Sequence, residues 1–399
     1  HATQMAGLLS WQEDVLAEIV LRLPFQSQFL VFSVCREWST IRHSPLLWSN
    51  LDLSRFNPND AAIIFRGTQH FYSQHVVNMN LRGCSFILPE EFTAMLHPGL
   101  RTLNVRGAGD VISLLALQSA CANTSLVELH VGWRSESDPG PGGCRLDPTS
   151  VFRAWPTLPG LTDLALPGCV NVGDDEVRQI ARCCPSLRSL DICYCRNVSD
   201  TAVPELAELR GSQLETVNFR CTYVGDRAMH SFADHCRAIT SLNISCCELV
   251  TDASMAHLLQ RCSHLRTLDI CYCGGLTAAT PELAVDVLAE AVMLGFGGMD
   301  ISDDLVRRMS LQCTNLTHLG IGGCKLLTAD AMGYIARGLT KMKALNLHQL
   351  TTIDIEAFEA LPLTLPQLQG LDLSGCNGPT CPPWRIILLM QQFPYKYDD

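Results

Sequence analysis

The residues of this sequence with the clearest chemical potential are its cysteines. There are 20 among 399 residues, and two pairs have a single residue between them: Cys193 with Cys195, and Cys271 with Cys273. Thiolates so close in sequence can bind zinc, but zinc sites usually combine two pairs, each with about two to four intervening residues. Both pairs also coincide with positions of a longer repeat described below. We therefore expect no metal site and no cofactor.

Other reaction chemistries lack their sequence signatures. No P-loop, dinucleotide fingerprint, G-x-S-x-G elbow or H-E-x-x-H motif is present, and the 12 histidines are scattered along the chain. We therefore expect no catalytic residue. The formal net charge of −11 and the absence of a lysine or arginine run argue against nucleic acid as the principal ligand.

Composition also predicts the compartment. The first residues lack the charged and apolar regions of a secretory signal, and residues 386–390 are far shorter than the roughly 20 apolar residues of a membrane span. So many unpaired thiols are typical of a reducing compartment. We expect a cytoplasmic or nuclear protein that does not bind a membrane.

Most cysteines belong to a repeated pattern. Leu187, Leu190, Ile192 and Cys195 follow the spacing L-x-x-L-x-I-x-x-C. The same spacing starts again at Leu161, Ile239, Leu265, Leu316 and Leu368, and looser copies start at Trp48, Val76, Leu100, Leu126, Leu214, Leu288 and Met342. Most of these thirteen starts lie 23 to 28 residues apart, which is typical of leucine-rich repeats.

Such repeats bury their apolar faces only by stacking on their neighbours. The predicted fold is therefore α/β, a right-handed leucine-rich-repeat solenoid or horseshoe with a parallel concave sheet and convex helices. A glycine- and proline-rich insertion at residues 132–150 interrupts it, and residues 377–399 form a C-terminal cap. The repeat that starts at Leu288 is irregular, with glycines at 295, 297 and 298, which indicates a local kink or sequence drift.

Helix starts are marked by acidic residues, which can accept hydrogen bonds from the free backbone N–H groups there. These are Asp174, Asp200, Asp226, Asp252, Asp303 and Asp330.

Residues between the buried leucines point outward, because side chains alternate across a strand. One outward column holds mostly Asn and Asp; it could form a binding ladder, but we interpret it as a position of the fold. The neighbouring columns contain aromatic and basic residues, the types that anchor protein interfaces. The candidate substrate-binding residues are Arg106, Trp133, Arg134, Tyr194, Arg220, Tyr272 and His348.

The segment before the repeats is different. Val15, Ile19 and Leu23 have helical spacing, and Pro24 ends that helix. With Val34-Cys35-Arg36, Trp38 and the Leu47-Trp48 pair, residues 9–48 resemble an F-box, a three-helix module that binds the Skp-type adaptor of cullin-based ubiquitin ligases. The resemblance assigns adaptor binding to Val15, Leu16, Ile19, Leu23, Pro24, Val34, Cys35, Trp38, Leu47 and Trp48.

Together with the cysteine-bearing repeats of residues 49–376, this segment makes the whole chain similar to F-box leucine-rich-repeat proteins. The resemblance implies a non-catalytic subunit of an SCF-type E3 ubiquitin ligase, with a Skp-type adaptor, a cullin and an unidentified protein substrate as partners. The alternative is a protein-interaction scaffold without a ligase, in which the N-terminal helices only cap the solenoid, as every solenoid requires. A cryptic enzyme or regulator is a third alternative, for which we see no site.

Overall fold

A computed structural model describes residues 15–20, 22–23, 27, 44–72, 75–108, 125–132, 157–377 and 380–393. The chain forms two compact units, one comprising His1–Arg134 and Cys144–Leu161, the other comprising Ser135–Gly143 and Thr162–Asp399. The expected boundaries of an N-terminal module at residue 48 and of a tail at residue 377 stay predictions.

The first unit contains four described strands that pair in parallel and in chain order. Each strand is only three residues long and has a buried central residue, such as Met79 in β2 and Leu103 in β3. Its elements are the 3-10 helix η1 (Pro45–Trp48), β1 (Asn50–Asp52), α4 (Pro58–Tyr72), β2 (Asn78–Asn80), α5 (Pro89–Thr93), β3 (Thr102–Asn104) and β4 (Glu128–His130).

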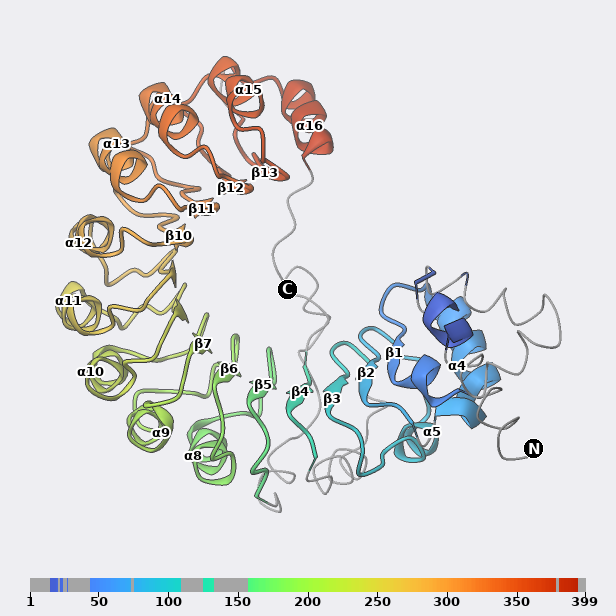
Figure 1. The fold of residues 1–399 in the computed structure, drawn as a ribbon. Helices are drawn as coiled ribbons and strands as arrows, with labels where there is room; N and C mark the ends of the chain where they lie inside the picture. The colour runs from blue at the N-terminus through green and yellow to red at the C-terminus, as the bar shows by residue number, and fades with distance from the viewer. Residues whose placement is uncertain are drawn as a thin grey trace, which may run out of the picture. The chain divides into compact units, whose positions relative to one another are not determined.

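The second unit contains nine described strands, which also pair in parallel and in chain order. Within it the strands line the inner side of an arc and the helices lie along its outer side (Figure 1). Its strands are β5 (Asp163–Ala165), β6 (Ser189–Asp191), β7 (Thr216–Asn218), β8 (Ser241–Asn243), β9 (Thr267–Asp269), β10 (Met293–Gly295), β11 (His318–Gly320), β12 (Ala344–Asn346) and β13 (Gly370–Asp372). Its helices are α8 (Asp174–Cys183), α9 (Val203–Arg210), α10 (Asp226–His235), α11 (Asp252–Arg261), α12 (Ala279–Val287), α13 (Asp303–Gln312), α14 (Ala329–Gly338), α15 (Ile355–Thr364) and α16 (Pro383–Gln392).

The core is the stack of repeat leucines that the sequence predicts. Leu187, Leu190 and Ile192 are fully buried, as are Val177 and Ile180 on the inner face of α8. Strand, turn and helix therefore recur as expected, and the α/β solenoid prediction is confirmed.

One of the repeat starts predicted from the sequence, Leu288, was wrong. The structure pairs Leu294 with Leu268 and Leu319, so this repeat begins at Ala291 and not at Leu288. Leu288 is buried, but it follows the end of α12 as its C-terminal cap. An apolar residue at the end of a helix was thus mistaken for the first residue of the following strand motif. With the corrected start, the repeat has an ordinary length.

The repeat cysteines support the turn that follows each strand. The thiol of Cys195 donates to the carbonyl of Leu166 at 3.2 Å, and the thiol of Cys247 donates to that of Phe219 at 3.2 Å, each in the preceding repeat. Burial raises the pKa of the Cys247 thiol to about 11, so the thiol stays protonated and remains a donor. These cysteines hold adjacent turns together.

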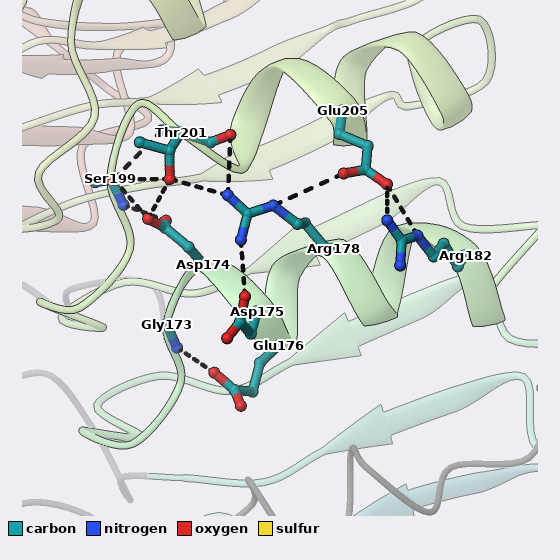
Figure 2. A network of polar contacts seen from close by, with 9 residues as sticks. All are labelled: Gly173, Asp174, Asp175, Glu176, Arg178, Arg182, Ser199, Thr201 and Glu205. Carbon is teal, nitrogen blue, oxygen red and sulfur yellow. Dashed lines mark hydrogen bonds and ion pairs between the residues drawn. The ribbon is translucent and has the colours of Figure 1, made fainter.

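Five of the six acidic residues predicted at helix starts, all except Asp330, join neighbouring repeats, which differs from the expectation that each would accept from its own helix. Asp174 accepts from the backbone N–H of Ser199 at 2.8 Å and from the hydroxyls of Ser199 and Thr201 in the following repeat (Figure 2). Beside it, Arg178 contacts Thr201 and pairs with the carboxylate of Glu205 on α9 (Figure 2).

The same connection recurs along the second unit. Asp226 binds Thr251, Asp252 binds Thr277 and Asp303 binds Thr328, each through one backbone N–H and one hydroxyl. Asp200 instead accepts from the N–H groups of Gly225, Arg227 and Ala228, and so caps α10 of the next repeat. The physical reason is the stacking of the repeats, which brings the turn of one repeat within reach of the carboxylate of the previous one.

The last repeat is covered by α16. The backbone N–H of Leu371 in β13 donates to the carbonyl of Phe393 at 2.9 Å, which gives the last strand a partner beyond β12. Ile386 and Leu389 of α16 are buried, whereas Trp384 is exposed. The helix therefore closes the apolar end of the stack.

Candidate functional site: a concave pocket of the second unit

Each strand from β2 to β13 is followed by a residue with a positive φ angle, usually glycine. At five of these positions the residue is not glycine. Tyr194, Cys221, Cys246, Tyr272 and Gln349 have φ angles between 55° and 60°. A residue with a Cβ atom pays a conformational cost in this left-handed region, and such residues concentrate at functional sites. The first four belong to four consecutive repeats, so the strained positions are clustered.

The next two repeats have the opposite property, because three concave positions in each of them carry glycine. Gly295, Gly297 and Gly298 occupy the positions of Asp269, Cys271 and Tyr272 in the preceding repeat, and the following repeat again has glycine at these three positions. We call Gly295, Gly297, Gly298, Gly320, Gly322 and Gly323 the glycine floor.

The glycine floor is required by what lies on it. A Cβ atom on Gly298 would lie 2.5 Å from the ring of Tyr272, and one on Gly322 would lie 2.2 Å from Nδ1 of His348. A Cβ atom on Gly323 would lie 2.9 Å from the hydroxyl oxygen of Tyr272. Tyr272 and His348 therefore lie over these glycines, one from each side of the floor.

Tyr272 and His348 meet above the floor although they are 76 residues apart in sequence. The Tyr272 hydroxyl and Nε2 of His348 are 2.5 Å apart, and the two rings are 5.9 Å apart. Nδ1 of His348 contacts Oδ1 of Asn346, an oxygen that also accepts from the backbone N–H of His348. A proton on Nδ1 satisfies this oxygen, so Nε2 accepts from the hydroxyl of Tyr272.

The electrostatics of Tyr272 agree with this assignment. Burial raises the pKa of Tyr272 to about 12, with nearby cysteines adding to the shift, so the hydroxyl stays protonated near neutrality. The residue as a whole is nevertheless 42% exposed. Tyr272 thus offers a ring surface to a ligand while its hydroxyl is held by His348.

These residues enclose a concave pocket of about 650 Å³. The pocket extends from Arg220 and Tyr194 at one end, across Cys246 and the glycine floor, to His348 at the other. Its further lining residues are Asn243, Ser245, Thr267, Asp269, Cys271, Tyr272, Val292, Met293, His318, Leu319 and Asn346. The volume lies in the usual range for ligand sites, about 300 to 1,000 Å³.

A cation lies at the end of the pocket opposite His348. The guanidinium carbon of Arg220 is 5.6 Å from the centre of the Tyr194 ring, within the range of a cation–π contact. Apolar and neutral polar groups line most of the middle of the pocket, together with the carboxylate of Asp269, which accepts from the backbone N–H of Cys271 and from the side chain of Asn243. The arrangement suits a ligand with an apolar body and a polar or negatively charged end near Arg220.

The outward Asn and Asp column has mainly a structural role, as interpreted from the sequence. The side chain of Asn218 accepts from the backbone N–H of Arg220 at 3.1 Å, and that of Asp191 accepts from Cys193 at 3.0 Å. The side chains of Asn243, Asp269 and Asp372 likewise each accept from the backbone N–H of the residue two positions further along the chain. Each of these side chains fixes the turn after its own strand.

Four of the predicted substrate-binding residues, Tyr194, Arg220, Tyr272 and His348, line the concave pocket together. Arg106 belongs to the first unit and is buried, so it offers little surface to a partner. Trp133 and Arg134 lie outside the described residues. The first unit has a smaller pocket of its own, about 330 Å³, over β1 to β4 and lined by residues that include Asn80 and His130.

The glycine floor was not predicted from the sequence. The wrong start at Leu288 shifted Gly295, Gly297 and Gly298 by three positions, so they did not align with Gly320, Gly322 and Gly323. An alignment that starts at Ala291 brings all six into three columns. The sequence therefore contained the signal, because two neighbouring repeats have glycine at the same three outward positions.

The predicted adaptor-binding residues are only partly described. Residues 15–20 are helical, as predicted, and Ala17 and Val20 form the buried side of the helix. Val15 and Ile19 are 57% and 46% exposed, whereas Leu16 and Leu23 are half-buried. Leu47 and Trp48 are buried and contribute to the core of the first unit. Pro24, Val34, Cys35 and Trp38 lie outside the described residues.

Two further classes of site, a metal site and a membrane span, are absent from the described part of the chain. No group of three or more histidine, cysteine or acidic side chains there is arranged to hold a metal ion. None of the helices in the described ranges has both the length and the apolar character needed to cross a membrane.

Neither a family model nor a curated protein matches the sequence. Among solved structures, the Rad7 and Elc1 complex in yeast matches with a TM-score of 0.52 at 16% identity, covering 98% of this chain and 89% of that chain. This similarity extends over nearly the whole chain and shows a shared leucine-rich-repeat fold.

Two weaker matches are also found. A TLR13–ssRNA13 complex matches with a TM-score of 0.43 at 20% identity, over 71% of this chain and 40% of that chain. An internalin, inlF of Listeria monocytogenes, matches with a TM-score of 0.41 at 16% identity, over 73% of this chain and 79% of that chain.

Proposed function

We propose that this protein is a substrate-recruiting subunit of an SCF-type E3 ubiquitin ligase. Its N-terminal helices bind a Skp-type adaptor that links it to a cullin, and its concave pocket binds a segment of the protein substrate. The chain itself is not an enzyme in this proposal. The cytoplasm or the nucleus is the compartment in which such a ligase acts.

The observation that carries the adaptor-binding part is the exposed apolar face of the N-terminal helix. Val15 and Ile19 are one helical turn apart and well exposed, while Ala17 and Val20 on the other side are fully buried. Exposed apolar side chains of this kind are typical of a surface that a partner covers. They stand at positions that the F-box resemblance assigns to adaptor binding.

The concave pocket supports the substrate-binding part. It combines a side-chain-free floor with the Tyr272 ring at one wall and Arg220 at one end. Interface hot spots are rich in tyrosine and arginine and lie in pockets that exclude water. A protruding side chain of the substrate fits the floor, and an acidic or amide group near it can contact Arg220.

The similarity to Rad7, whose structure was solved in complex with Elc1, is compatible with this proposal. That protein has a comparable fold over 89% of its chain and was crystallised with a second protein. By analogy, we expect the present chain to work as part of a protein complex.

The proposed mechanism requires no reactive side chain. Binding the substrate and the ligase core to one chain places a substrate lysine near the ubiquitin carrier, and the gain in effective concentration accelerates transfer. The interlocked repeats keep the pocket in a fixed position within its own unit, through contacts such as Asp252 with Thr277.

The test is a reconstituted reaction that contains the chain, a Skp-type adaptor, the cullin-based ligase core, ubiquitin and its carrier enzyme. We expect the wild-type chain to join the complex and ubiquitin to be transferred to it or to a bound protein. Trp38→Ala should abolish both results. Arg220→Ala, which changes the pocket alone, should leave complex formation unchanged. If the folded wild-type chain does not join the complex, the protein is an interaction scaffold outside a ligase.

A further inference from the structure

Two of the strained positions beside the concave pocket are cysteines in adjacent repeats. Strands β7 and β8 pair in register, with Asn218 opposite Asn243, and three residues further along each chain stand Cys221 and Cys246. The register continues into the turns, because the backbone N–H of Cys221 donates to the carbonyl of Ser245 at 2.9 Å. The two cysteines therefore occupy equivalent places on neighbouring strands.

This placement suits a disulfide bond. Neighbouring strands lie about 4.8 Å apart, and disulfides usually join residues with Cα atoms about 4.4 to 6.8 Å apart. The φ angles of Cys221 and Cys246 are 55° and 59°, so both backbones direct their Cβ atoms in the same way. In the structure both cysteines are free and half-buried, and the Cys246 thiol influences the pKa of Cys221.

The surroundings make Cys221 the nucleophile of the pair. The hydrogen bond with Cys246, the positive charge of Arg220 and contacts with Tyr194 lower the pKa of Cys221 to about 6, although burial opposes this shift. The same hydrogen bond and burial raise the pKa of Cys246. The lowered pKa of Cys221 favours its thiolate, the form that attacks an oxidant, while the raised pKa of Cys246 favours its thiol.

Two other cysteines of the described region, Cys247 and Cys183, have raised rather than lowered pKa values. Burial raises the pKa of Cys247 to about 11, and its thiol donates to the carbonyl of Phe219. Cys183 is half-buried like Cys221, but desolvation raises its pKa. Both are natural controls within the same chain.

We propose that Cys221 and Cys246 form an oxidisable thiol pair at the edge of the concave pocket, which hydrogen peroxide converts into a disulfide. The Cys221 thiolate attacks one oxygen of the peroxide, the O–O bond breaks, and the leaving hydroxide takes up a proton to become water. The sulfur of Cys246 then loses its proton and displaces hydroxide from the sulfenic acid of Cys221. Hydrogen peroxide is thereby reduced to two water molecules while two thiols are oxidised to one disulfide.

The reaction changes the pocket directly. Cys246 lines the pocket, and Arg220 and Tyr194 beside Cys221 form its end. A disulfide removes the thiolate that Arg220 faces and fixes the two turns to each other. The chemistry of the pair does not depend on the ligase function, so the two proposals can be tested separately.

The first measurement is the rate of alkylation. The intact reduced chain is treated with limiting iodoacetamide at pH 7, and modified cysteines are identified by peptide mass spectrometry. We expect Cys221 to be modified at least tenfold faster than Cys183 and Cys247. In Arg220→Gln this advantage should decrease several-fold. Equal rates at Cys221 and Cys183 would overturn the assignment of a nucleophile.

The second measurement follows oxidation by hydrogen peroxide. We expect trypsin to release a disulfide-linked pair of peptides, one beginning at Cys221 and one containing both Cys246 and Cys247. Cys247→Ser should retain this link. Cys246→Ser should lose it and should accumulate a sulfenic acid at Cys221, which dimedone traps. If the folded wild-type chain forms no such link, or if the link persists in Cys246→Ser, the proposal is wrong.

Discussion

Gly298→Ala tests whether the glycine floor exists to hold the Tyr272 ring. Gly298 has a φ angle of 73°, so any side chain there pays a left-handed cost of about 1 to 2 kcal/mol. Its Cβ atom would also lie 2.5 Å from the Tyr272 ring, which must move and thereby lose its hydrogen bond to His348. That loss adds about 0.5 to 1.5 kcal/mol. We expect a total destabilisation of about 1.5 to 3.5 kcal/mol in guanidinium unfolding at neutral pH.

Gly375→Ala is the matched control. Gly375 has nearly the same φ angle, 74°, but the one tight contact of its Cβ atom would be the flexible side chain of Gln349, at 3.0 Å, with the backbone nitrogen of Gln349 at an ordinary contact distance of 3.6 Å. It should therefore cost only the backbone part, about 1 to 2 kcal/mol. A double-mutant cycle isolates the ring: in a Tyr272→Ala background, Gly298→Ala should cost no more than Gly375→Ala. Equal costs of the two alanine variants in the wild-type background would refute our account of the floor.

Two further predictions concern the stability of the solenoid. Leu190→Ala removes a fully buried side chain and should lower the free energy of unfolding by about 2 to 5 kcal/mol in denaturant titrations; a cost below 1 kcal/mol would contradict the stacked core. Asp252→Asn weakens hydrogen bonds from Thr277 and Thr280 and should cost about 1 to 3 kcal/mol by the same assay, with the exposed Asp175→Asn expected to be neutral. Hydrogen bonds from Thr277 and Thr280 hold the pKa of Asp252 below its usual value despite the opposing effect of burial. Its stabilisation is therefore complete above the unfolded-state pKa of about 3.9 and is lost as the pH falls through the folded-state value. A stability that does not decrease below pH 4 in wild type, or that decreases equally in Asp252→Asn, would contradict this role.

The repeat architecture could be predicted because its signal is local and recurs. An error in one repeat does not change the predicted fold, because the other repeats still show the pattern. The spacing around Leu187 and Leu190 was enough to predict a parallel solenoid. The acidic residues at the helix starts were recognised, but their partners were not. Asp174 binds the next repeat, and sequence spacing alone does not report which turn lies within reach of a carboxylate.

The candidate site was predicted in part. Tyr194, Arg220, Tyr272 and His348 were chosen for residue type and outward position, and the structure brings them to one pocket. The contact between Tyr272 and His348 depends on the absence of side chains at the positions between them. Tyr272 reaches His348 across two repeats only because the intervening positions are glycine, and the wrong start at Leu288 concealed that pattern.

Backbone conformation was the second missing feature. The sequence offers Cys221 and Cys246 as residues outside the buried cysteine columns, but nothing in their spacing shows that both have positive φ angles on paired strands. Their coupling became apparent only from the register of β7 and β8 and from the charge of Arg220 beside them.

The most direct test of the proposed function is a binding titration of the intact chain with a purified Skp-type adaptor. Our account predicts a dissociation constant below micromolar, corresponding to a binding free energy of about −8 kcal/mol or better. Binding should weaken at least tenfold in Ile19→Asp, whose side chain is exposed, and should be unchanged in the pocket variant Tyr272→Ala. No detectable binding by the folded wild-type chain would contradict the assignment to a ubiquitin ligase and would leave an interaction scaffold built on the concave pocket.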